Sequence, residues 1–237
     1  MGWHWQMMDD RGRLITFEGI DGAGKTTQIR RVQAWLMAHP AWRSRRSLVV
    51  TREPGGTAIG RQLRQLLLAG PSLAAGEGER LDEGAELMLY AADRAQHVAT
   101  VLVPTLMQGG VVLCDRYVDS TIAYQGYGRQ LNLKMIEVLN DLATSGLRPD
   151  LTLWLDVPVD AGALRRQRRS PGEEGDRLEE EGRAFHERVR SGFAALAQRD
   201  CDRVVRIDGT GDEATVFAQV QGVLRDRFRS WYGMELD

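Results

Sequence analysis

Cysteine and long hydrophobic runs are scarce in this chain of 237 residues, and each scarcity excludes a class of protein. The two cysteines, Cys114 and Cys201, are too few for a disulfide framework and lack the spacing of metal ligands, so we expect both to be reduced. No stretch approaches the roughly 18 to 20 apolar residues that a membrane-spanning helix requires. The N-terminal segment MGWHWQMMDD has neither the basic region nor the apolar run of a signal peptide. We therefore expect a cytoplasmic protein with no membrane partner.

An excess of charge of one sign is also absent. The chain has 31 Lys and Arg against 33 Asp and Glu, a net charge of −2, which argues against a generally basic nucleic-acid surface. Its 43% hydrophobic and 27% charged residues are typical of a globular protein and not of a disordered one. Lysine is rare: of the 31 Lys and Arg residues, only Lys25 and Lys134 are lysines. A lysine kept at a special position in such a chain indicates chemistry that a guanidinium cannot replace.

Short apolar segments alternate with amphipathic ones along the chain. Strands are predicted at 13–18, 47–51, 111–115, 151–157 and 203–208. Helices are predicted at 25–38, 57–69, 82–108 with a bend at Pro104, 131–145, 160–169 and 179–197, and from the last strand to about residue 228. This order favours an α/β fold in which helices cover both faces of a five-stranded, mainly parallel sheet, with ligands at the carboxyl ends of the strands. Without repeats or linkers, residues 11–237 are expected to form a single domain, and residues 1–10 an N-terminal extension that need not be ordered.

The segment GIDGAGKT follows the first predicted strand and opens a helix, and it matches the phosphate-loop pattern G-x-x-x-x-G-K-[ST]. At this chain's own residue frequencies, chance would give roughly two matches per thousand such chains. In such a loop backbone N–H groups surround phosphate oxygens, Lys25 reaches the β and γ phosphates, and Thr26 offers its hydroxyl to Mg²⁺. The predicted fold is thus the three-layer P-loop NTPase fold, and the nucleotide site comprises Gly19, Ile20, Asp21, Gly22, Ala23, Gly24, Lys25 and Thr26. The loop alone does not separate GTPases, transport ATPases and small-molecule kinases.

Further polar segments follow the other predicted strands. TREPGGT at 51–57 follows the second strand, DRY at 115–117 closes the third, and STIAYQG comes after it at 120–126. Together with FEGIDG at 17–22 and DRAQH at 93–97, these segments resemble thymidylate kinase, and the resemblance covers most of the chain. It implies a homodimer that uses ATP and Mg²⁺ to phosphorylate dTMP to dTDP, of the bacterial type whose lid supplies arginines.

One charged side chain interrupts an apolar stripe on the long predicted helix. Leu87, Ala91 and Val98 share a helical face with Arg94, and Tyr90 lies one turn before it. A charge on an inward face needs a partner, which is either a carboxylate in a buried ion pair or a group of the ligand. The resemblance implies that Tyr90 stacks on the thymine and that Arg94 bonds its edge.

Two arginines lie just beyond the carboxyl ends of predicted strands, where a guanidinium can grip phosphate oxygens in a bidentate fork. In a chain this rich in arginine, Arg52 or Arg116 taken alone can also be a surface residue. The resemblance implies that both hold the acceptor phosphate, with Arg116 catalytic beside Lys25. Asp115 ends an apolar run, where it either binds Mg²⁺ or caps a helix.

The resemblance implies the remaining contacts with dTMP. It places Asp21 against the deoxyribose 3′-hydroxyl and the phosphate region. Tyr124 would lie on the 2′ side of the sugar and exclude a ribose. Thr121 and Gln125 would complete the pocket. Taken by themselves these side chains read as polar loop residues.

The arginine-rich segment that begins at Arg165 runs into SPGEEG, a stretch of Gly, Pro and acid, and predicts a lid at about 165–178. An arginine delivered when a lid closes contributes roughly 10³ to 10⁵ in rate. Arg168 and Arg169 are the first candidates, because Gly22 occupies the loop position at which some thymidylate kinases carry an arginine. A nucleic-acid patch is the alternative, which the net charge and the lack of interleaved aromatics disfavour.

Two other functions remain open at this point: a kinase for another nucleoside monophosphate such as dUMP or dGMP, and a non-catalytic nucleotide-binding module. The pocket of Tyr90, Arg94 and Thr121 argues for thymine, and the absence of N-K-x-D argues against a GTPase-type module. The attacking phosphate is already anionic at pH 7, so no general base is required. None of the histidines (His4, His39, His97 and His186) is therefore assigned a catalytic role.

Overall fold

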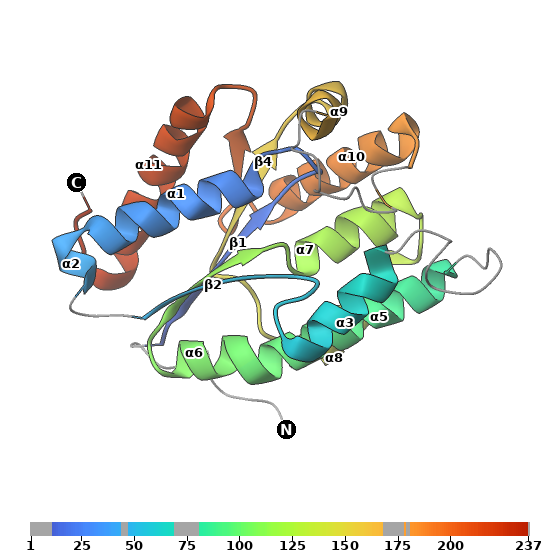
Figure 1. Cartoon of the computed structure of the whole chain (residues 1–237), viewed down its shortest axis with the longest axis horizontal. Helices are drawn as coiled ribbons and strands as arrows, with labels where there is room; N and C mark the ends of the chain where they lie inside the picture. Colours follow the sequence, from blue (N-terminus) through green and yellow to red (C-terminus); the bar gives the residue numbers. More distant parts are fainter. Residues whose placement is uncertain (1–10, 44–46, 69–80, 168–177, 179–180, 237) are drawn as a thin grey trace.

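The computed structural model describes residues 11–43, 47–68, 81–167, 178 and 181–236. Its strands form one parallel sheet in the order β2-β3-β1-β4-β5, and Figure 1 shows helices on both sides of this sheet. They are β1 (Arg13–Glu18), β2 (Leu48–Arg52), β3 (Val111–Asp115), β4 (Leu151–Asp156) and β5 (Val204–Asp208). Each boundary lies within one residue of the predicted one, and the predicted α/β class with a five-stranded parallel sheet is confirmed.

The register of the strands brings the predicted site residues to one edge of the sheet. Arg52 pairs with Asp115 across β2 and β3, and Phe17 pairs with Asp115 across β1 and β3. Glu18, the last residue of β1, pairs with Trp154 of β4. All strands run in the same direction, so their carboxyl ends and the turns that follow them meet at this edge.

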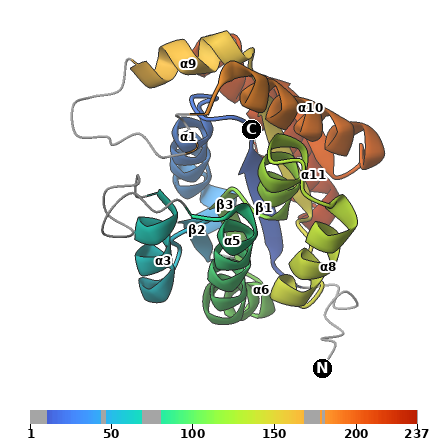
Figure 2. The ribbon, with the colours of Figure 1, turned by 90° about the vertical axis from the view of Figure 1, so that its right-hand side faces the viewer.

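Alternating residues of the strands pack on different helices, which gives the fold its three layers (Figure 2). Odd-numbered residues such as Ile15 and Leu113 share a core with α1 (Lys25–Ala38) and α11 (Glu213–Tyr232). Even-numbered residues such as Leu14 and Val112 pack on the segment of residues 98–107. The remaining helices are α2 (Pro40–Arg43), α3 (Ala58–Leu68), α5 (Glu83–His97), α6 (Val103–Met107), α7 (Val118–Thr121), α8 (Leu133–Thr144), α9 (Val159–Gln167) and α10 (Arg183–Arg199).

The long helix predicted at 82–108 is divided in the structure. Asp82 caps α5 by accepting from the backbone N–H groups of Gly84 and Ala85, and a π-helical turn, η2 (Val98–Leu102), separates α5 from α6. Pro104 lies in the first turn of α6. A proline lacks the N–H for an i to i−4 bond, and the widened turn before it absorbs the disruption. The predicted bend is thus a π-helical turn before Pro104.

Sequence reasoning missed the helical segment that follows DRY. Here α7 continues into a π-helical segment, η3 (Ile122–Gly128), which is almost entirely buried. Its glycines and polar residues show no apolar stripe at helical spacing, so periodicity gave no signal. The segment packs closely against α10 and also contacts α8, and that packing stabilises it.

Residues 1–10, predicted as an extension, lie outside the described residues, and the division into one domain stays a prediction. No helix in the described ranges is long and apolar enough to cross a membrane.

Candidate active site

A cavity of about 1040 Å³ opens at the carboxyl edge of the sheet. Its walls come from the turn after β1, the ends of β2 and β3, and helices α5 and η3. The loop residues Gly19 and Ile20 do not line it, and their carbonyl groups accept from Lys25. The cavity brings together the predicted acceptor residues Asp21, Arg52, Tyr90, Arg94, Arg116, Thr121, Tyr124 and Gln125 with the loop residues Gly22, Ala23, Gly24, Lys25 and Thr26.

The phosphate loop has the backbone that its glycines predict. Gly22 and Gly24 have φ values of 81° and 96°, in the left-handed region that glycine tolerates. A Cβ at Gly22 would lie 2.3 Å from the carbonyl oxygen of Gly162 in α9. An arginine at position 22, which some related kinases have, would therefore require the backbone of the loop or of α9 to shift.

Lys25 is buried at the start of α1, with its Nζ 3.0 Å from the carbonyl oxygens of both Gly19 and Ile20. Burial and the neighbouring Arg116 guanidinium lower the pKa of this ammonium group. An anionic phosphate beside Nζ would offset both effects.

Thr26 and Asp115 supply oxygen ligands beside the loop. The Thr26 hydroxyl donates to Asp115 Oδ2 at 2.8 Å, from the start of α1 to the end of β3. A hydroxyl and a carboxylate are hard oxygen donors of the kind that Mg²⁺ accepts when phosphates and water complete its shell. This pair therefore fits Mg²⁺.

Asp21, Arg116 and Tyr124 form one cluster of hydrogen bonds. Arg116 Nη2 donates to Asp21 Oδ1 and, at 3.1 Å, to the Tyr124 hydroxyl, which in turn donates to Asp21 Oδ2 at 2.9 Å. The guanidinium also lies 4.8 Å from the centre of the Tyr124 ring. Burial opposes ionisation of Asp21, but Arg116 and Lys25 outweigh it and lower its pKa well below the usual range. Asp21 therefore stays ionised, and its charge is paired with that of Arg116.

Arg116 also bridges the phosphate loop and the loop that follows β3. Its Nη1 donates to the carbonyl oxygen of Gly19 and to the hydroxyl of Ser120, each at 3.1 Å. Asp21, foremost, raises the pKa of Arg116 against the opposing effect of burial. The predicted strand-end position of this arginine thus places it where donor and acceptor loops meet.

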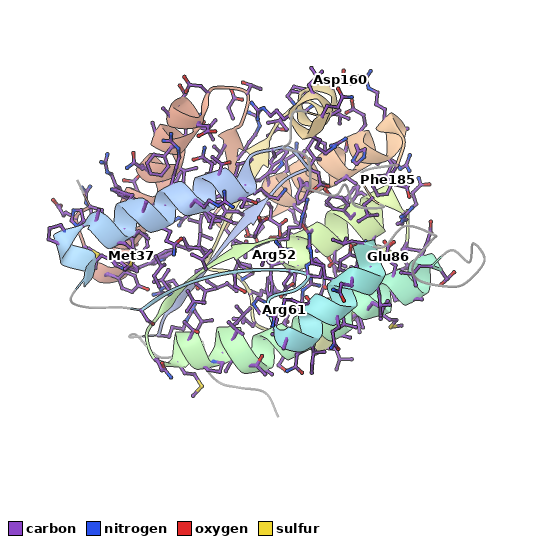
Figure 3. The ribbon with its side chains drawn as sticks, in the orientation of Figure 1. Met37, Arg52, Arg61, Glu86, Asp160 and Phe185 are labelled. Carbon is purple, nitrogen blue, oxygen red and sulfur yellow. The ribbon has the colours of Figure 1, made fainter. Side chains whose placement is uncertain are left out.

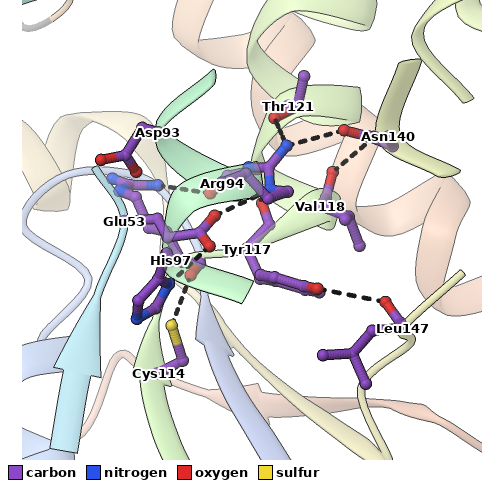
Figure 4. A network of polar contacts seen from close by, with 12 residues as sticks. Glu53, Asp93, Arg94, His97, Cys114, Tyr117, Val118, Thr121, Asn140 and Leu147 are labelled. Carbon is purple, nitrogen blue, oxygen red and sulfur yellow. Dashed lines mark hydrogen bonds and ion pairs between the residues drawn. The ribbon is translucent and has the colours of Figure 1, made fainter. Parts of the chain in front are cut away.

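Arg94 is 2% exposed, and its partners come from several elements (Figure 4). Its Nε donates to Glu53 Oε2 at 2.8 Å, Nη1 to Thr121 and Asn140, and Nη2 to the carbonyl oxygen of Tyr117. Glu53 is thus the carboxylate partner of this charge, and the contact of Arg94 with a ligand stays a prediction. In the described part of the chain, these bonds use four of the five guanidinium N–H groups. One N–H on Nη2 remains for a ligand.

Glu53 joins the TREPGGT and DRAQH segments. Its other oxygen, Oε1, lies 2.8 Å from His97 Nδ1, and His97 Nε2 lies 2.7 Å from the Thr51 hydroxyl. Asp93 accepts from the backbone N–H of Gly55 at 3.0 Å. His97 is fully buried behind Glu53 and does not line the cavity.

The other predicted acceptor residues also line the cavity. Arg52, the last residue of β2, is exposed at the cavity (Figure 3). Tyr90 is half-buried in the cavity wall. Gln125 donates to Glu86 at 2.8 Å, with both side chains buried. These positions leave the Arg52 guanidinium and the Tyr90 ring accessible from the cavity.

The structure describes only the first part of the arginine-rich segment that was predicted as a lid. Arg168 and Arg169 lie outside the described residues. Arg166 of α9 donates to the carbonyl oxygen of Asp21 at 3.1 Å, and Arg165 lines the cavity and donates to Thr210 and Gly211. Sequence reasoning did not select Arg165 and Arg166, although the same RRQRR segment contains them.

Comparisons with known proteins agree with this geometry. A family model described as thymidylate kinase matches residues 17–220. A thymidylate kinase of Acaryochloris marina is 49% identical over 232 residues, which cover 93% of this chain and 99% of the relative. One of Synechococcus sp. (strain RCC307) is 51% identical over 216 residues, with 91% and 97% covered. The crystal structure of thymidylate kinase from Ehrlichia chaffeensis matches with a TM-score of 0.70 and 34% identity, covering 90% of this chain and 99% of that one.

Proposed function

This chain belongs to the thymidylate kinase family and is therefore an enzyme that phosphorylates dTMP with ATP, and we propose how its own residues carry out that transfer. The observation that carries the proposal is the position of Arg116. It contacts Gly19 of the phosphate loop and the Asp21–Tyr124 pair in one cavity. A residue at this junction can bring the attacking oxygen of one phosphate to the γ-phosphorus of another.

The donor half is the phosphate loop. Lys25, now bonded to carbonyl groups of the loop, would turn to the β and γ phosphates of ATP. The Thr26 hydroxyl and the Asp115 carboxylate would hold Mg²⁺, which neutralises negative charge on the phosphates when it is bound. Arg168 or Arg169 would add charge from the lid, and the position of Arg166 beside Asp21 supports this, because α9 leads directly into that segment.

The acceptor half grips the dTMP phosphate and the sugar. Arg52 and Arg116, on adjacent strand ends, would bind the phosphate oxygens. Asp21 would accept from the 3′-hydroxyl, and Tyr124 would leave no room for a 2′-hydroxyl. The phosphate attacks as an anion, so positioning and charge supply the catalysis without a general base.

Tyr90, Arg94, Thr121 and Gln125 would form the thymine pocket. Tyr90 would stack on the base, and the remaining N–H of Arg94 would donate to a carbonyl oxygen of its edge. Since Glu53, Thr121 and Asn140 already hold the guanidinium, the base meets a donor fixed in advance.

We also propose a cytoplasmic homodimer with no nucleic-acid or membrane partner. Support comes from large apolar side chains that are exposed on α3, α5 and α8. Of these helices, α5 packs against both α3 and α8. They are Ile59, Leu66, Met88, Met135, Val138 and Leu142. Such a patch favours an interface with a second copy of the chain. Sedimentation of the purified protein tests this: a monomer at micromolar concentration contradicts it.

Substrate preference and one lysine pair test the proposed function. Purified protein with ATP and Mg²⁺ should form ADP only when an acceptor is added, and it should form more ADP with dTMP than with dUMP. Lys25→Ala should lower turnover at least about 10²-fold, while Lys134→Ala, the exposed second lysine of the chain, should not change it. ADP release without an acceptor, or a preference for a purine monophosphate, would overturn the acceptor pocket.

A further inference from the structure

Glu18 is a buried carboxylate for which the reaction described above has no role. It ends β1 directly before the phosphate loop and is 0% exposed. Its Oε1 accepts from the backbone N–H groups of Tyr117 and Ser120, at 2.8 and 3.3 Å, and its Oε2 accepts from the Ser120 hydroxyl at 2.5 Å. All of these donors lie within four residues of Arg116, on Tyr117 and on Ser120 of α7.

The backbone of Arg116 needs such support. Its φ of 69° lies in the left-handed region, which side chains with a Cβ rarely adopt unless the surroundings impose it. The N–H of Arg116 donates to the carbonyl oxygen of Phe17 at 3.0 Å, and the next N–H, of Tyr117, donates to Glu18. Two neighbouring residues of β1 thus hold the amides on both sides of the strained residue.

Glu18 reaches the side chain of Arg116 as well. A serine hydroxyl has one proton, and Ser120 gives it to the carboxylate, so its lone pairs face Arg116 Nη1 at 3.1 Å. A neutral glutamine in place of Glu18 would present an N–H group to Ser120 or to the backbone amides. Either orientation removes at least one of these acceptors.

Packing alone does not account for a carboxylate here. Burial, and then the nearby carboxylate of Asp119, raise the pKa of Glu18 to about 7, which Ser120, Arg116 and the Tyr117 amide partly offset. An apolar side chain at the end of β1 would avoid this cost of burial. The carboxylate is retained where its only direct contacts in the described chain are the donors around Arg116.

We propose that Glu18 is the positioning residue of Arg116, setting its backbone through Tyr117 and its guanidinium through Ser120. The inference rests on the proposed role of Arg116 at the acceptor phosphate. Glu18 does not touch either nucleotide. It acts only through Arg116, and its removal should therefore matter only while Arg116 is present.

A double-mutant cycle of Glu18→Gln and Arg116→Ala tests this. Glu18→Gln alone should lower kcat/KM for dTMP by about 10- to 100-fold, because displacement of a catalytic group by an ångström has effects of this size. The KM for ATP should stay within about twofold, since the phosphate loop keeps its contacts. In the Arg116→Ala background, Glu18→Gln should change kcat/KM by less than about twofold.

Asp150→Asn is the matched control. Asp150 is a carboxylate whose side chain is only 5% exposed, and it accepts a backbone N–H from Leu14 at 2.8 Å. It also pairs with Arg11 and Arg13, and it lies at the opposite edge of the sheet. The Asp150→Asn substitution should lower thermal stability without selectively lowering kcat/KM for dTMP. If Glu18→Gln does not fold, Ser120→Ala takes its place in the cycle and should lose part of the effect, again only with Arg116 present.

The outcomes separate this inference from the proposed function. Full activity of Arg116→Ala would overturn the role of Arg116 in catalysis, and this inference with it. If Arg116→Ala is impaired and the two substitutions act additively, only the positioning role of Glu18 is wrong. An equal loss of kcat/KM for dTMP in Asp150→Asn would reduce Glu18 to a structural carboxylate.

Discussion

Arg94 and Arg116 both bring a guanidinium into the acceptor cavity, yet the fold holds them in different ways. Arg94 stands in regular helix α5, and side chains from other elements, above all Glu53, bind almost its whole guanidinium. Arg116 stands in a strained loop that β1 holds through the backbone. Its guanidinium pairs with Asp21, which itself belongs to the phosphate loop.

The difference fits the roles proposed for the two residues, with Arg94 as a fixed recognition group and Arg116 as a group that takes part in the transfer. Withdrawal of a partner from Arg94 leaves a buried charge unpaired, which costs folding free energy. Arg116 is 17% exposed in its side chain, and its partner Asp21 lines the same cavity. A bound phosphate can therefore compete for it. We expect substitutions around Arg94 to affect stability first, and substitutions around Arg116 to affect turnover first.

The largest effect on turnover is expected from Arg116→Lys. An ammonium cannot bond Asp21, Tyr124 and Ser120 while also forming a bidentate contact with phosphate. We expect kcat to fall by about 10²- to 10³-fold, with the midpoint of thermal unfolding nearly unchanged. Steady-state kinetics and calorimetry of the same sample check this. A large loss of stability with normal kcat would remove the distinction from Arg94.

Glu53→Gln tests the other side of the comparison. The substitution leaves the buried Arg94 without its counter-charge and disturbs the contact with His97. The free energy of unfolding should fall by about 3 kcal/mol, and the KM for dTMP should rise more than kcat falls. Chemical denaturation measures the first and initial rates the second.

Glu83→Gln is the control for Glu53→Gln. Glu83 is half-exposed and lies 3.9 Å from Arg129, so its loss should cost less than about 1 kcal/mol. Equal losses in the two variants would mean that the burial of the Glu53–Arg94 pair has no energetic weight.

The same comparison explains what sequence reasoning could and could not find. The phosphate loop is contiguous, and its spacing alone identifies Lys25 and Thr26. The strands were predicted within one residue, because apolar runs in a parallel sheet end where polar residues begin. Arg94 was found as a charge in an apolar stripe, but Asn140 was not, since it binds Arg94 from a separate helix and breaks no pattern of its own.

The supports of Arg116 were hidden for a related reason. Glu18 and Ser120 lie in segments that were recognised as motifs, but their contact depends on α7 and η3, which periodicity did not predict. Burial of Glu18 is a property of how that segment packs over the end of β1. A motif shows which residues are neighbours along the chain. It does not show that Glu18 bonds to Ser120, about 100 positions away.

The pH dependence of stability sharpens the account of Glu18. Its pKa is about 7 in the folded protein against an ordinary value of 4.5, so between these pH values the unfolded chain loses a proton that the folded chain keeps. The stability that protonated Glu18 contributes is complete below about pH 4.5 and is lost as the pH rises through 7. Relative to Glu18→Gln, which does not titrate, the unfolding free energy should fall by about 3 kcal/mol from pH 5 to 8. Urea unfolding of both proteins across this range measures the difference, and a constant difference contradicts the assignment.

The smallest effect on turnover is expected from substitution of Tyr124, the neutral member of the cluster that it forms with Asp21 and Arg116. Tyr124→Phe keeps the ring beside the guanidinium and removes only the hydroxyl that donates to Asp21 and accepts from Arg116. A hydrogen bond to a charged group contributes about 1.5 to 3 kcal/mol, so kcat/KM for dTMP should fall by about 10- to 100-fold. Stability should change little, because Asp21 keeps its bond with Arg116. The ring, and with it any exclusion of ribose, stays in place, so the ratio of dTMP to UMP phosphorylation should not change. If that ratio fell, the hydroxyl and not the ring would select the deoxy sugar.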